Sequence, residues 1–230
     1  MRDLREDLDP VWRSLRRRLS GADGAPILMF TSALQGEGVT SMAASFACLA
    51  ARRSDKPVWL VDLDLRQNQA YRGFERGFAR DVGAPGRAYD ASLQTTPFFR
   101  LAPPPRNGRA AKLLTAHDVE GLPLLVTRFR GERLEKGQKV SLCATPDWWQ
   151  TLRQMSGWII IDAPALQRSA AAMTLAANAD GIILVVEADR TTPRQIANAH
   201  ADLQEKGGQV LGAVMNQVKS DALWLDRRRA

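Results

Sequence analysis

The sequence predicts an α/β fold in which a parallel, doubly wound sheet is flanked by helices. Several short segments are almost entirely apolar, as in Ile182-Ile183-Leu184-Val185-Val186. Strands of this kind are buried on both faces, which is typical of a parallel sheet covered by helices. Segments with helical spacing of apolar residues alternate with these strands along the chain. The length of 230 residues and the hydrophobic content of 45% suit one domain with a sizeable core.

The N-terminal region predicts a helix and a linker ahead of the sheet. Apolar residues recur there at spacings of three and four: Leu4, Leu8, Val11, Trp12, Leu15 and Leu19. We expect the stable helix to start at Pro10, in the first helical position, with Asp9 as its N-cap. The predicted division of the chain is an N-terminal helix and linker (1–24), a main domain (25–220) and a basic C-terminal tail (221–230).

The main domain predicts strands and helices in alternation. The expected strands are residues 26–31, 58–61, 98–102, 158–162, 181–187 and 210–215. The expected helices are residues 39–53, 109–117, 148–155, 167–178 and 192–206. Residues 70–98 carry little periodicity, so they predict an irregular segment with one helix. Residues 124–130 and 139–143 are expected to pair as a β-hairpin around Gly131–Gly137, inserted into the fold.

A glycine turn joins the first predicted strand to the helix that follows it. Residues 31–41 read T-S-A-L-Q-G-E-G-V-T-S. Strand, glycine turn and helix form the layout of a phosphate-binding loop, in which backbone N–H groups hold phosphate oxygens. In the pattern G-x-x-x-x-G-K-[ST], the Lys binds the β- and γ-phosphates and the hydroxyl binds Mg²⁺. Gly38 and Thr40 match this pattern, Ala33 replaces the first Gly, and Val39 stands in the place of the Lys. We therefore predict a P-loop NTPase sheet whose loop keeps its shape and loses catalytic capacity.

Acidic residues follow two of the predicted strands. Asp62 and Asp64 end one strand and Asp162 ends another. The carboxyl ends of parallel strands meet at one edge of an open α/β sheet, where ligands bind. Two carboxylates and a hydroxyl beside a triphosphate form a Mg²⁺ site. The predicted metal ligands are therefore Thr40, Asp62 and Asp162.

Charge and composition narrow the function less than the loop does. The net charge is +7, with arginines clustered at 13–18 and 227–229. Such clusters fit an anionic partner, and a solvated surface explains them equally well. No apolar segment approaches the ~20 residues of a membrane helix, and no apolar signal core is present, so a cytoplasmic location is expected. Cys48 and Cys143 predict free thiols in apolar surroundings, and His117 and His200 predict surface positions.

Together the motifs resemble the bacterial tyrosine kinases (BY-kinases) of capsule and exopolysaccharide synthesis, within the Min- and Par-type P-loop ATPases. The matching stretches are Gln35-Gly36-Glu37-Gly38 with Thr40, Leu60-Val61-Asp62-Leu63-Asp64-Leu65-Arg66, Ile160-Ile161-Asp162-Ala163-Pro164, and the segments 179–186 and 210–216. The resemblance covers most of residues 10–218, and its most specific part is the D-x-D-x-R segment.

The resemblance implies roles for these residues. Bound ATP or ADP with Mg²⁺ would lie against Gly36, Glu37, Gly38, Val39, Thr40, Ser41 and Asn216. Asn216 matches a position that contacts the adenine base. Asp64 is the second acidic residue of the site and is catalytic if the protein is active.

Three departures from the family affect these roles. Val39 removes a charged hydrogen bond of about 1.5–3 kcal/mol, which lowers ATP affinity roughly ten- to hundredfold. It also removes a transition-state donor, at a cost of about 10²–10³ in rate. The tyrosine cluster of the family is missing, since the tyrosines here are Tyr71 and Tyr89. The family's oligomerisation pattern E-x-x-R-x-x-R keeps Arg13 and Arg16 and has Pro10 in place of Glu.

The leading hypothesis is a catalytically impaired BY-kinase-like protein, a pseudokinase. By resemblance it would regulate polysaccharide synthesis or export by binding the membrane polysaccharide co-polymerase, or another export-complex protein, at the inner face of the plasma membrane. Homo-oligomerisation is open, and nucleic acid is not an expected partner. One alternative is an active Min- or Par-type ATPase that switches dimerisation or attachment to DNA or membrane. Another is a scaffold that binds no nucleotide.

Overall fold

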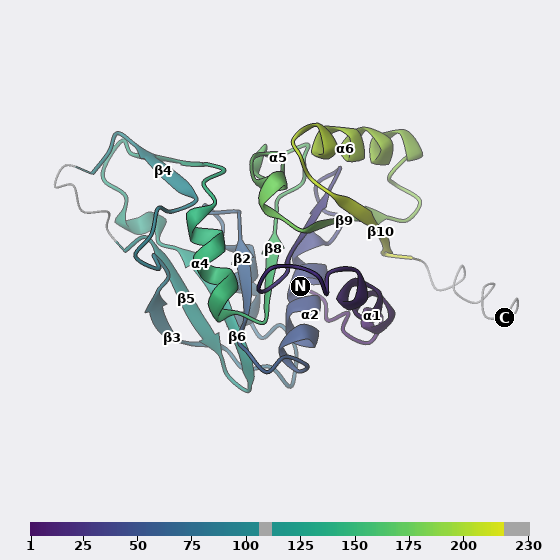
Figure 1. Cartoon of the computed structure of the whole chain (residues 1–230), viewed down its shortest axis with the longest axis horizontal. Coiled ribbons are helices and arrows are strands. Elements are labelled where there is room, and N and C mark those ends of the chain that lie inside the picture. Colours follow the sequence, from purple (N-terminus) through teal and green to yellow (C-terminus); the bar gives the residue numbers. More distant parts are fainter. Residues whose placement is uncertain (106–111, 219–230) are drawn as a thin grey trace, which may run out of the picture.

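The computed structural model describes residues 1–105 and 112–218. Its centre is an eight-stranded sheet in the order β10-β9-β1-β8-β2-β6-β5-β3 (Figure 1). The strands β10, β9, β1, β8, β2 and β6 run parallel, and β5 and β3 extend the sheet by antiparallel pairing. The strands of this sheet are β1 (Ile27–Ser32), β2 (Val58–Asp62), β3 (Pro85–Asp90), β5 (Leu114–Val119), β6 (Leu122–Phe129), β8 (Trp158–Asp162), β9 (Gly181–Glu187) and β10 (Val210–Asn216). The predicted mixed fold with a large, mostly parallel sheet is confirmed.

Helices cover both faces of the sheet. One face carries α1 (Asp9–Arg18), α2 (Val39–Ala51) and α3 (Gln69–Glu75). The other carries α4 (Asp147–Met155), α5 (Ala171–Leu175) and α6 (Pro193–Glu205), with a 3-10 turn at Ala176–Asn178. The helix predicted at residues 167–178 is therefore shorter than expected and starts later.

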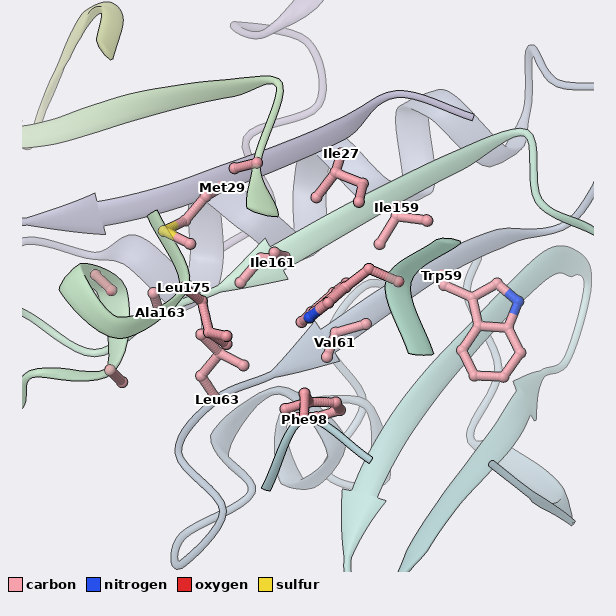
Figure 2. Packing of buried hydrophobic residues seen from close by; sticks show 14 of the residues in the cluster. Ile27, Met29, Trp59, Val61, Leu63, Phe98, Ile159, Ile161, Ala163 and Leu175 are labelled. Atoms are coloured by element: carbon pink, nitrogen blue, oxygen red, sulfur yellow. The ribbon is translucent and has the colours of Figure 1, made fainter. Parts of the chain in front are cut away.

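Side chains alternate between two hydrophobic cores because successive residues of a strand point to opposite faces. In β1, Ile27 and Met29 face α4 and α5, whereas Leu28 and Phe30 face α2. Figure 2 shows the first of these cores, where Ile159 and Ile161 of β8 lie beside the β1 residues. Every residue of β1, β2 and β8 is buried, which explains the uninterrupted apolar runs in the sequence.

The N-terminal segment packs on α2 and corrects one detail of the prediction. The helix begins at Asp9, after Leu8, so Asp9 is helical and does not cap. The Asp9 carboxylate forms ion pairs with Arg13 and Arg53. Ahead of the helix, the backbone N–H of Arg2 and that of Leu4 donate to hydroxyls in the first turns of α2, at Ser41 and Ser45.

The segment between residues 80 and 143 differs most from the prediction. β3 was expected to be irregular, and the strand β5 replaces the helix predicted at residues 109–117, of which residues 109–111 lie outside the described part. The predicted hairpin of 124–130 with 139–143 is wrong. β6 instead pairs with β5, across a tight turn at Gly121 with φ of 83°, and with β2.

The second half of that predicted hairpin joins a separate sheet. β7 (Lys139–Leu142) pairs antiparallel with β4 (Phe99–Ala102). Four residues of each strand are paired. This two-stranded sheet is separate from the main sheet. Local propensity favoured a hairpin, and long-range pairing overrides it.

The structure also tests predictions made for single side chains and for membrane helices. Trp148 and Trp149 are fully buried, and His117, which was predicted at the surface, is buried as well. Cys48 and Cys143 are free thiols. The basic tail predicted at 221–230 lies outside the described residues. Among the helices of the described part, none has the length and apolar content required to cross a membrane.

Candidate functional site

The glycine loop joins β1 to α2 at the carboxyl edge of the parallel strands. Gly36 and Gly38 have φ values of 92° and 89°, in the left-handed region that favours glycine. No side chain caps α2 at Gly38, and its first turn contains no acidic residue. The N–H groups of this first turn are therefore left for a ligand, and the helix dipole favours an anion.

Three side chains at or just after the carboxyl ends of β9 and β10 bind this loop on the side away from the cavity described below, which we call its outer side. Arg190 donates to the carbonyl of Gln35 (2.9 Å), Gln217 to that of Gly36 (3.1 Å) and Asn216 to that of Glu37 (2.8 Å). Three successive carbonyl groups thus point away from the cavity.

The Glu37 side chain fixes the same loop from within the protein. Its carboxylate is fully buried and accepts hydrogen bonds from the N–H of Leu34 (2.8 Å) and of Glu187 (2.9 Å). The Thr191 hydroxyl donates to it as well. The Glu37 side chain thus links the loop to the end of β9. The predicted part of Glu37 in nucleotide binding stays a prediction.

A cavity of about 310 Å³ lies on the inner side of the loop. Its walls contain all the predicted site residues except Asn216. They are Gly36, Glu37, Gly38, Val39, Thr40, Ser41, Asp62, Asp64 and Asp162, with Met1, Ser32, Gln35, Gln69, Ala163, Pro164, Ala165 and Arg168. The structure thus brings together residues from four segments that lie far apart in the sequence. The contact of Asn216 with a base stays a prediction.

The strand register places two of the carboxylates side by side. Asp62 of β2 and Asp162 of β8 are direct partners in parallel strands, which lie about 4.8 Å apart. Both are buried. Burial raises the pKa of Asp162 to about 7, against a hydrogen bond with Thr40 that lowers it. Burial and the nearby Asp162 also hold the pKa of Asp62 well above its usual range.

Asp62 has a structural role in addition to its place in the cavity. Its two carboxylate oxygens accept hydrogen bonds from the N–H of Asp64 (2.8 Å) and of Ala70 (2.9 Å). These bonds order the turn that leads into α3. Asp162 and Thr40 are thus less engaged with the backbone than Asp62 is.

Arg168 is the site residue that the sequence did not reveal. Its guanidinium forms an ion pair with Asp64 at 2.6 Å, at the mouth of the cavity. The one available signal was a cation in the loop after a strand that ends in Asp162. A lone arginine in a loop does not by itself indicate a site, so only the fold shows its place on the cavity wall.

The residues fit a nucleotide phosphate group and Mg²⁺. The uncapped first turn of α2 supplies N–H donors, and Thr40, Asp62 and Asp162 supply oxygens. Within the described residues, no group of three acidic, His or Cys side chains forms a metal site. Mg²⁺ is commonly held by one or two carboxylates together with substrate phosphates and water, so it would need the nucleotide to complete its ligands.

Comparisons with known proteins agree with this geometry. The chain is 28% identical over 192 residues to the tyrosine-protein kinase YwqD of Bacillus subtilis (strain 168), a match that covers 84% of this chain and 72% of that protein. These similarities support a relationship to the bacterial tyrosine kinases. No model of a protein family matches the chain.

Solved structures show the same fold. The kinase domain of the Escherichia coli tyrosine kinase ETK superposes with a TM-score of 0.62 at 16% identity, over 94% of this chain and 78% of that one. The MinD cell division protein of Aquifex aeolicus gives 0.53 at 17% identity, over 88% and 73%. Bacterial tyrosine kinase domains and MinD therefore share this fold.

Proposed function

We propose that this protein is a catalytically impaired member of the bacterial tyrosine kinase family that acts through protein interaction and binds ATP or ADP with Mg²⁺ weakly. Its role would be to regulate synthesis or export of an exopolysaccharide or capsule. The observation that carries this proposal is Val39, an apolar side chain at the lysine position of a phosphate loop that keeps Gly36, Gly38 and Thr40.

The energetics favour binding without efficient transfer. Backbone N–H groups and the helix dipole remain, and these supply much of the binding of a phosphate. Phosphoryl transfer depends on positioning and on charge that stabilises the transition state. Loss of one such donor costs about 10²–10³ in rate, while binding loses about ten- to hundredfold. Catalysis is thus affected more than binding.

The proposed partner rests on the resemblance to the bacterial tyrosine kinases. We propose a membrane polysaccharide co-polymerase or another protein of the export complex as the partner. This places the protein at the inner face of the plasma membrane. The exposed arginines of α1 are available for such a contact.

A phosphotransfer assay with an added acceptor tests this proposal. Purified protein is incubated with Mg²⁺ATP and a Glu-Tyr copolymer, and both phosphotyrosine and ADP release are measured. We expect neither above background, and we expect both to rise in Val39→Lys. A Val39→Lys/Thr40→Ala double variant is the control, because it regains the lysine and loses the hydroxyl predicted to hold Mg²⁺.

Each outcome separates one interpretation from the others. Phosphotyrosine formed by the unmodified protein overturns the proposal. ADP release without phosphotyrosine, abolished by Asp64→Ala, supports a Min- or Par-type ATPase switch instead. Absence of nucleotide binding at millimolar concentration in calorimetry supports a scaffold that binds no nucleotide.

A further inference from the structure

The cavity contains one positive side chain on its wall, and this charge is not where a P-loop usually has it. Of the described residues that line the cavity, Arg168 alone is Lys or Arg. It shares the cavity with three aspartates, Asp62, Asp64 and Asp162. The negative charges of a bound polyphosphate would be repelled strongly by these aspartates when ionised, if no cation neutralised them.

The backbone that carries Arg168 is fixed beside the phosphate loop. The N–H of Leu166 donates to the carbonyl of Ser32 (2.9 Å), and the N–H of Gln167 to that of Ala33 (3.2 Å). The Gln167 side chain in turn accepts from the N–H of Gln35 (3.3 Å). Three hydrogen bonds thus hold residues 166–167 against the first half of the loop, and Arg168 follows directly.

The side chain of Arg168 is held less firmly than its backbone. Its guanidinium pairs with Asp64 on the cavity wall, with 29% of the Arg168 side chain and 11% of the Asp64 side chain exposed. Ion pairs that contact water contribute about 0–1 kcal/mol, so exchange of partners is inexpensive. A guanidinium also binds phosphate through two parallel N–H groups.

We propose that Arg168 is the phosphate-binding cation of this site and replaces the lysine missing at position 39. A nucleoside di- or triphosphate draws Arg168 away from Asp64, and the freed Asp64 carboxylate then faces the Mg²⁺ that accompanies the nucleotide. The inference rests on the proposed weak nucleotide binding and identifies the residue responsible for it.

Substitutions at the two ends of the ion pair have opposite expected effects. Arg168→Ala removes the cation and weakens ADP binding roughly ten- to hundredfold. Asp64→Asn frees the cation from its competitor and strengthens binding of ADP measured in EDTA. A purely structural ion pair would predict the same direction for both. Calorimetric titration with ADP, with Mg²⁺ and with EDTA, measures these effects.

A double-variant cycle tests the replacement itself. Val39→Lys is expected to make Arg168→Ala nearly harmless, because a second cation then occupies the phosphate site. Arg168→Lys keeps the charge and is expected to lose less affinity than Arg168→Ala. Arg194→Ala, at an exposed position of α6, is the matched control for loss of one surface charge and is expected to leave ADP affinity unchanged. Thermal unfolding verifies that each variant folds.

The results distinguish this inference from the proposed function. If the unmodified protein binds ADP and Arg168→Ala binds it equally well, Arg168 has no such role and the proposed function stands. If Val39→Lys and Arg168→Ala are simply additive, the two positions do not share a phosphate and the replacement is overturned. If the unmodified protein binds no nucleotide, the nucleotide-binding part of the proposed function fails as well.

Discussion

The two sides of the phosphate loop differ in function: side chains on the outer side hold the loop in shape, whereas the inner side has lost the lysine that would bind a phosphate. On the outer side, Arg190, Asn216 and Gln217 each bind a loop carbonyl, and the buried Glu37 carboxylate links the loop to β9. On the inner side, the lysine position holds Val39, and the cation on the cavity wall is bound to Asp64. The shape of the loop is therefore maintained mostly by side chains that do not line the cavity.

This difference explains how the loop can keep its conformation after the catalytic lysine is lost. A Gly-rich turn with left-handed residues costs conformational entropy and keeps its shape only where surrounding bonds specify it. Here these bonds come from behind the loop, so a change inside the cavity leaves them intact. Substitutions on the outer side should thus alter stability, and substitutions on the inner side should alter binding.

The largest effect is expected from Glu37→Ala. The substitution leaves the buried N–H groups of Leu34 and Glu187 without an acceptor, and each such loss costs about 1–3 kcal/mol. We expect the free energy of unfolding to fall by about 4 kcal/mol, measured by urea denaturation. Glu205→Ala, at an exposed position of α6, is the control and should change it by less than about 0.5 kcal/mol. A fall confined to nucleotide affinity, with unchanged stability, would contradict the outer-side assignment.

The next effect concerns the pH dependence of stability. The pKa of Asp162 is raised to about 7 by burial, above its ordinary value of 3.8. The folded state therefore binds more protons than the unfolded state between these values, and stability is lost as the pH rises from about 4 through 7. One pKa unit corresponds to about 1.4 kcal/mol. Asp162→Asn should flatten this decline, as followed by urea denaturation at several pH values.

Mg²⁺-dependent binding of ADP gives a second test of the raised pKa of Asp162. Mg²⁺ binds the ionised carboxylate, so Mg²⁺-dependent ADP affinity should rise with pH through about 7. A stability that rises with pH over the same window, unchanged in Asp162→Asn, would mean that Asp162 is already ionised in the folded protein.

A smaller effect is expected from returning the lysine. Val39→Lys adds one charged hydrogen bond, of about 1.5–3 kcal/mol, to a phosphate held by an intact loop. ADP affinity should rise about ten- to hundredfold in calorimetry, and Val39→Met provides a control of similar length without charge. Unchanged affinity would show that the loop does not present position 39 to the ligand. The hydrogen bonds on the outer side would then be insufficient to keep the loop in a phosphate-binding shape.

The sequence predicted the parallel half of the molecule well. Buried strands such as 158–162 are apolar throughout and end in a polar residue, so both their type and their edge are evident. The cavity residues Thr40, Asp62 and Asp162 follow from the same rule, because strand ends meet at one edge. Their local sequence contains the information needed to place them.

The antiparallel part and Arg168 were not predictable in this way. Residues 114–119 carry an alternation too short to distinguish strand from helix, and β5 is specified by its pairing with β6. β4 and β7 are about 40 residues apart and meet only in the folded chain. Arg168 belongs to the site because residues 166–167 bond to the phosphate loop, a contact with no local signal.

The smallest effect compares two of the outer bonds with each other. Asn216 is half-buried and donates to the carbonyl of Glu37 at 2.8 Å, whereas Gln217 is exposed and donates to that of Gly36 at 3.1 Å. A net hydrogen bond contributes about 0.5–1.5 kcal/mol, and water replaces an exposed one more readily. Asn216→Ala should thus lower the free energy of unfolding by about 1 kcal/mol and Gln217→Ala by less than about 0.5 kcal/mol. Hydrogen exchange at Gly36 and Gly38 measures the local effect directly, and faster exchange should accompany the first substitution. If neither substitution changes stability or exchange, the side chains of Asn216 and Gln217 add nothing to the shape of the loop.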